Sequence, residues 1–161
     1  MKKIFYLALL FCSIILVGNI HAQTQGVFSE TLLGGWNGTG TLFNQKASFK
    51  MQWENELNSK FMVLNFENRF NDKSGVERVM NAKAYYNLEQ NKGVWFDSRG
   101  MILPLVLEIN NDSMTVLWGD QETEKGKTIY SLVDDEHMSV EDFVFKDNSY
   151  MLFGRALYLK E

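Results

Sequence analysis

The sequence has few of the side chains that cross-link a chain, ligate metals or act as nucleophiles. Its 161 residues include one cysteine, one proline and two histidines. The cysteine, Cys12, lies in an apolar segment near the N-terminus, so the rest of the chain must fold without a disulfide. Acidic residues outnumber basic ones by 20 to 16. Because no basic run occurs after residue 22, neither a nucleic acid nor an anionic membrane surface is expected as a partner.

The N-terminal segment has the pattern of an export signal. Lys2 and Lys3 precede an almost wholly apolar run over residues 4–17, and Ala22 provides the small residue of a cleavage site. The run is too short to cross a bilayer comfortably, since a spanning helix needs about 20 residues. We therefore predict a signal peptide over 1–22 and an exported mature chain over 23–161, periplasmic or secreted, with a formal charge of −6 in place of −4.

Residues 23–161 have the pattern of a single β-sheet domain. Apolar and polar side chains alternate strictly over 47–54, as in a strand with one buried and one solvated face. The last such run places Tyr150, Leu152 and Ala156 on one face. Turn residues recur every 10 to 16 positions, which predicts about ten antiparallel strands joined by hairpins. An open sheet of that size would expose two edges, so we expect an all-β, up-and-down barrel. Its polar outer face predicts no membrane span.

Two short motifs, about 120 residues apart, resemble those of a known superfamily. They are GWNGTG at 35–40, opening the first strand, and FGR at 153–155 in the last. Together with the β-meander between them, they resemble the calycins (lipocalins, fatty-acid-binding proteins and nitrobindin-like barrels), and most of all small exported bacterial lipocalin-like proteins of unassigned function. The resemblance implies a structural signature made by Gly35, Trp36 and Arg155, in which Arg155 stacks on Trp36 at the closed end. Such a cation–π contact contributes about 0.5–2 kcal/mol.

The sequence has few groups of residues that could form a catalytic or metal-binding site. His137 is the single histidine after residue 22 and follows Asp134, Asp135 and Glu136 in a polar turn. A solvated turn is the expected role of this segment; a Ca²⁺ site, or a hydrolase or isomerase built on His137, is the alternative. Haem, as in nitrobindin-like barrels, would need a ligand from a last strand that offers only tyrosines. We predict a protein that is not an enzyme and has no metal or cofactor.

Two charged positions are candidates for fixing the polar end of a ligand. Arg99 follows an aromatic strand at the expected rim, where it would bind a carboxylate or form a turn pair with Asp97. Glu141 and Asp142 are adjacent in a strand, so one must point inward unless a bulge intervenes. An inward carboxylate needs a partner, either a ligand or one of three arginines. Those arginines are Arg69, Arg78 and Arg155.

The expected inner face is rich in aromatic and methionine side chains, which suit an adaptable apolar site. We predict binding of a small apolar or amphipathic molecule by a monomer or weak dimer. The alternative is a filled barrel that acts as an envelope interaction module. A cavity above roughly 300 Å³ favours binding, and a solid interior favours the alternative. The predicted binding residues are Trp53, Phe66, Tyr86, Trp95, Arg99, Trp118, Tyr130 and Asp142.

Overall fold

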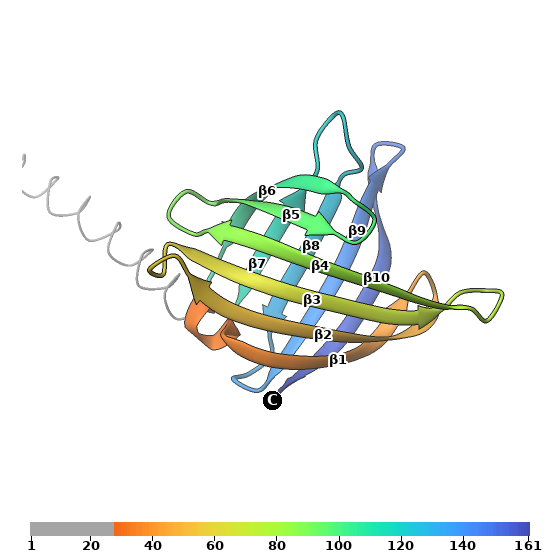
Figure 1. The fold of residues 1–161 in the computed structure, drawn as a ribbon, viewed down its shortest axis with the longest axis horizontal. Helices are drawn as coiled ribbons and strands as arrows, with labels where there is room; N and C mark the ends of the chain where they lie inside the picture. The colour runs from red at the N-terminus through yellow and green to blue at the C-terminus, as the bar shows by residue number, and fades with distance from the viewer. Residues whose placement is uncertain (1–27) are drawn as a thin grey trace, which may run out of the picture.

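The computed structural model describes residues 28–161, which form a closed barrel of ten antiparallel strands preceded by one helical turn at 28–32 (Figure 1). The predicted signal peptide, 1–22, lies outside the described residues. The strands are β1 (Gly34–Leu42), β2 (Gln45–Glu56), β3 (Phe61–Asn71), β4 (Glu77–Asn87), β5 (Lys92–Asp97), β6 (Ile102–Ile109), β7 (Ser113–Trp118), β8 (Gly126–Leu132), β9 (His137–Lys146) and β10 (Ser149–Lys160).

The strands follow one another around the barrel in chain order. Each strand pairs with the next, and β1 closes the sheet by pairing with β10 from Trp36↔Lys160 to Leu42↔Gly154. Several of the short hairpins turn through an asparagine with positive φ, for example Asn44 at 63° and Asn148 at 58°. Asparagine tolerates this left-handed conformation better than most residues. The predicted all-β, ten-stranded antiparallel barrel is therefore confirmed.

The two ends of the barrel differ in what covers them (Figure 1). The helical turn and the end of β10 lie at one end, which we call the closed end. The connections β1–β2, β3–β4, β5–β6, β7–β8 and β9–β10 lie at the other, which we call the open end. Along each strand, side chains alternate between the interior and solvent, as in β6, where Leu103, Leu105 and Leu107 are buried. No helix within 28–161 is long and apolar enough to cross a membrane.

One irregularity in β10 overturns an expected face assignment. The register with β9 shifts between Leu152 and Gly154, so Phe153 is an extra, bulged residue. Tyr150 and Leu152 are 45% and 42% exposed, whereas Ala156 is buried. The prediction that these three residues share one face is wrong, because the bulge reverses the phase of alternation within the strand.

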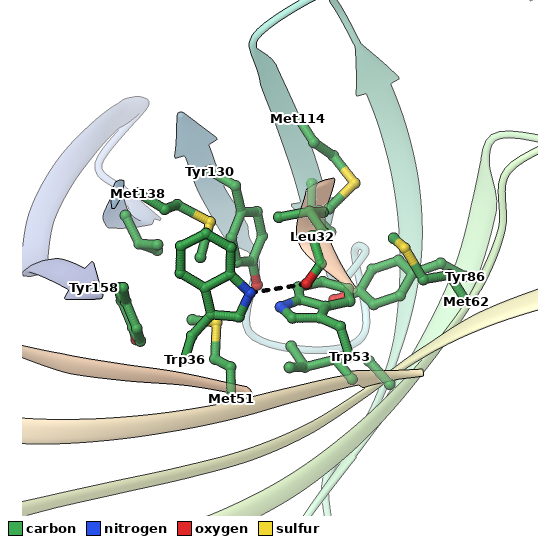
Figure 2. Packing of buried hydrophobic residues seen from close by; sticks show 14 of the residues in the cluster. Leu32, Trp36, Met51, Trp53, Met62, Tyr86, Met114, Tyr130, Met138 and Tyr158 are labelled. Carbon is green, nitrogen blue, oxygen red and sulfur yellow. Dashed lines mark hydrogen bonds between the residues drawn. The ribbon is translucent and has the colours of Figure 1, made fainter. Parts of the chain in front are cut away.

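The closed end is a packed apolar core (Figure 2). The helical turn buries Phe28 and Leu32 inside the barrel. Trp36, which is 1% exposed, donates a hydrogen bond from Nε1 to the Leu32 carbonyl oxygen at 2.8 Å. This bond ties the turn to β1. Met114 and Met138, both fully buried, fill the space around these groups. The tryptophan of the opening motif thus lies at the closed end.

The basic residue against this tryptophan is not the expected one. Arg155 is exposed on the outer face, opposite Thr41 of β1, so its predicted stacking on Trp36 is wrong. Lys160 takes that place: its Nζ lies 5.3 Å from the centre of the Trp36 ring and donates to the Thr31 carbonyl oxygen at 2.6 Å. The strand register explains why Lys160 and not Arg155 lies against Trp36, because Lys160 is the residue of β10 that pairs with Trp36.

Candidate ligand-binding site

The open half of the barrel encloses a cavity of about 610 Å³. All ten strands contribute to its lining, together with residues of the loops at the open end. Ligand pockets in proteins measure about 300–1,000 Å³ and have mainly apolar walls. Side chains therefore do not fill the interior. The alternative of an envelope interaction module would have required a filled barrel.

Aromatic rings form much of the cavity wall. Phe66 of β3 lies between Phe49 of β2 and Trp95 of β5, with ring centroids 6.4 and 5.8 Å away. Phe49 also contacts Tyr158 of β10, with centroids 5.9 Å apart. Among the predicted wall residues, the structure brings five aromatic side chains to the cavity. They are Phe66, Tyr86, Trp95, Trp118 and Tyr130.

Trp53 is the exception among the predicted wall residues. It is 1% exposed and does not line the cavity. Its ring packs below Tyr86 and Tyr130, with centroids 5.4 and 5.6 Å away (Figure 2). Alternation gives the face on which a residue lies but not its height along the barrel, so it does not distinguish Trp53 from the residues that line the cavity. Trp53 belongs to the closed-end core beneath the cavity floor.

Asp142 is the carboxylate that points into the barrel. Strict alternation along β9 places it on the inner face with Val140 and Val144, and all three line the cavity. Thr128, its partner residue on β8, donates from Oγ1 to Asp142 Oδ1 at 2.7 Å. The other carboxylate oxygen lies against Gly154, where an added Cβ would come within 3.1 Å of Oδ2. The glycine of the FGR motif thus leaves room for this carboxylate.

The surroundings of Asp142 disfavour its charged form. Burial raises the pKa of Asp142 to about 6, although the hydrogen bond from Thr128 acts in the opposite direction. Burial also raises the pKa values of the neighbouring phenols Tyr86, Tyr130 and Tyr158, and the Asp142 charge raises them further. These three hydroxyl groups therefore stay neutral at physiological pH.

None of the arginines expected as partners reaches Asp142. Arg69 pairs on the outside with Glu67, at 2.7 Å. Arg78 pairs with Asp72 at the open end, also at 2.7 Å, and Arg155 is exposed. Within the part of the chain that the structure describes, Asp142 forms no salt bridge.

Arg99 lies at the mouth of the cavity and is already paired. Its Nη2 lies 2.7 Å from Asp97 Oδ2 and 2.7 Å from Glu124 Oε1. Burial raises the pKa of Asp97, but hydrogen bonds from Arg99 and from Trp95 Nε1 outweigh burial and lower it. Gly100 follows with φ of 83°. Arg99 and Asp97 thus form a turn pair, which was the alternative to binding of a ligand carboxylate by Arg99.

Sequence reasoning missed two polar residues of the cavity, Thr128 and Asn68. Asn68 is 4% exposed and lines the cavity, and its Oδ1 has no hydrogen-bond partner. It interrupts the apolar inner face of β3 between Phe66 and Phe70. That interruption is visible in the sequence, because a polar residue in the buried phase of a strand needs a reason.

His137 lies away from the cavity. It begins β9 at the closed end, where its Nδ1 lies 2.9 Å from Asp134 Oδ1 and its side chain is 42% exposed. A hydrolase or isomerase built on His137 would need this imidazole at the mouth of the cavity, and the structure places it at the opposite end. Among residues 28–161, no three His, Cys, Asp or Glu side chains converge as metal ligands would.

The described residues define a class of protein: a closed ten-stranded antiparallel β-barrel with a cavity in one half. No protein-family model matches the chain, and a comparison with curated proteins gave no match.

Proposed function

We propose that this protein binds a small apolar or amphipathic molecule inside its barrel and acts by binding rather than by catalysis. The observation that carries the proposal is the cavity of about 610 Å³ beneath the loops of the open end. We further propose that the barrel is of the lipocalin-like, calycin kind, which the ten-stranded closure and the place of Trp36 support.

The make-up of the cavity supports a mainly apolar ligand with one polar end. Binding sites for small molecules combine apolar and aromatic walls with a few placed polar groups. Here the walls are aromatic, and the polar groups inside are few, with Asn68 and the Asp142–Thr128 pair on different sides of the barrel. A ligand that satisfied them would be oriented as well as held.

The proposal includes a cellular setting. We infer export, with cleavage after Ala22, from the pattern of residues 1–22, and we infer a monomer or weak dimer as the working form. A binding protein of this size needs no second subunit to complete its cavity, since all ten strands of one chain close it.

A titration with N-phenyl-1-naphthylamine tests the proposal directly. This apolar dye is uncharged at neutral pH and fluoresces when it leaves water. We expect one dye molecule to bind per chain of 23–161. Val116 is buried and lines the cavity, so Val116→Phe should reduce dye affinity at least about tenfold by filling the site. Val106→Phe, on the outer face of the neighbouring strand, is the matched control and should leave affinity unchanged.

Native mass spectrometry of protein purified from an envelope extract of its own host gives the ligand class and the oligomeric state together. A stoichiometric small molecule that leaves on denaturation is the expected result. A consistently ligand-free mass, together with dye binding that Val116→Phe does not change, would contradict the proposal.

A further inference from the structure

The charged groups around the cavity leave it with an excess of negative charge. Two arginines lie at the mouth, and both form salt bridges: Arg78 with Asp72, and Arg99 with Asp97 and Glu124. Asp142 adds a further carboxylate deeper in the barrel, without a cation. Charges interact more strongly inside a poorly hydrated cavity than in water, so this interior favours a positively charged guest.

A separate polar atom of the cavity lacks a hydrogen-bond donor. Asn68 Oδ1 is buried, lines the cavity and accepts no hydrogen bond. It lies on β3, which is not a neighbour of β9 in the barrel, so it is independent of the Asp142–Thr128 pair. Both Asn68 Oδ1 and the Asp142 carboxylate are acceptors. A guest that satisfied them would bring N–H or O–H donors into the barrel.

We propose that the ligand is an organic amine whose ammonium group binds Asp142 and whose apolar body lies against the aromatic wall; this inference rests on the proposed ligand-binding function. An ammonium group supplies up to three N–H donors and the missing positive charge. Aromatic residues that line the cavity near Asp142, such as Tyr130 and Tyr158, are favourable neighbours for a cation. A carboxylate ligand would instead be repelled by Asp142.

Among Asp142 and the groups that face it, Asp142 is the one whose charge changes near neutral pH. Tyr130 on β8, Tyr158 on β10 and Tyr86 on β4 have pKa values raised by burial and remain neutral from pH 5 to 8. Asp142, with its pKa raised to about 6, loses most of its charge by pH 5. The other charged groups around the cavity are the paired side chains of the mouth: Asp72, Arg78, Asp97, Arg99 and Glu124.

The test is competition against N-phenyl-1-naphthylamine by three probes with the same body: 4-phenylbutylamine, 4-phenylbutan-1-ol and 4-phenylbutanoate. At pH 8 the amine should displace the dye at a concentration about tenfold or more below that of the alcohol, with the carboxylate weakest. Lowering the pH to 5 should weaken amine binding about tenfold, because Asp142 becomes protonated while the ammonium, with a pKa of about 10, stays charged. Alcohol binding should not change.

Asp142→Asn removes the charge at nearly constant size. It should abolish both the preference for the amine over the alcohol and the pH dependence of that preference, each measured relative to the dye affinity of the same variant. Thr128→Val is the second variant. Because the Thr128 hydrogen bond lowers the pKa of Asp142, its loss should move the midpoint of amine binding to higher pH. This shift decides the matter even if Asp142→Asn does not fold.

The outcomes separate the two proposals. Failure of the dye to enter the wild-type cavity overturns the proposed function itself. Dye binding with no preference for the amine, or with a preference that persists in Asp142→Asn, overturns the amine inference and leaves ligand binding intact.

Discussion

The four tryptophans divide evenly between the two ends of the barrel, and the two pairs have different surroundings. At the closed end, Trp36 and Trp53 are each 1% exposed and packed on every side. At the open end, Trp95 and Trp118 are half-buried and face the cavity. The same side chain therefore fills the core at one end and leaves space beside it at the other.

Polar groups follow the same division. At the closed end, Trp36 Nε1 and Lys160 Nζ both donate to carbonyl oxygens of the helical turn, although Trp53 Nε1 lacks an acceptor. In the open half, Asn68 Oδ1 is unpaired and Asp142 has no cation. Unpaired acceptors in a poorly hydrated place lower stability. The closed end thus stabilises the fold, whereas the open half keeps polar groups that the described residues do not fully pair.

The largest expected effect is a loss of stability on substitution of a tryptophan, and comparing one tryptophan from each end tests this division directly. Trp36→Ala should lower the free energy of unfolding by about 3–5 kcal/mol, because it opens a cavity in the core and removes the bond to Leu32. Trp95→Ala should cost at most about 2 kcal/mol, since only part of that side chain is removed from water. Urea unfolding followed by far-ultraviolet circular dichroism measures both. Equal losses would show that the two ends contribute alike.

A second, somewhat smaller effect concerns the open end alone. The pKa of Asp142 is raised from its ordinary 3.8 to about 6, so the folded state binds more protons than the unfolded state between these values. The contribution of Asp142 to stability should therefore fall as the pH rises from 4 to 7, by about 3 kcal/mol at most. Asp142→Asn should be more stable than the wild type at pH 7 by up to that amount, and equally stable near pH 4.

Urea midpoints at the two pH values compare the wild type with Asp142→Asn. A stability difference that is the same at pH 4 and pH 7 would show that the substitution acts through packing and not through the charge of the carboxylate.

The smallest expected effect sharpens the description of the closed end. Lys160→Met should cost about 1 kcal/mol, because it removes the cation over Trp36 and the hydrogen bond to the Thr31 carbonyl. For a domain of this size the thermal midpoint should fall by about 2–4 °C. Lys46→Met, on the exposed face of β2, is the matched control. An equal drop in the control would assign the effect to surface charge in general.

Strand number, closure and the inward position of Asp142 could be predicted from the sequence because they depend on period-two alternation. Asp142 follows Val140 and precedes Val144 in the buried phase, and no bulge interrupts β9 there. The bulge lies in the facing strand at Phe153, where no local pattern marks the extra residue. Alternation cannot locate an inserted residue from one strand alone.

The remaining errors concern relations between distant parts of the chain. The choice of Lys160 over Arg155 as the partner of Trp36 depends on the register between the first and last strands, which are joined only when the barrel closes. The place of Trp53 below the cavity depends on the tilt of the strands. Both are properties of the closed sheet, so a single strand pattern does not contain them.

The two ends of the described chain leave the barrel at the same pole. The helical turn at 28–32 and the last residue lie at the closed end, where the Glu161 backbone N–H donates to the Gly35 carbonyl oxygen (Figure 1). A tether attached at either terminus of this domain would hold the molecule upright, with its mouth facing away from the anchoring surface.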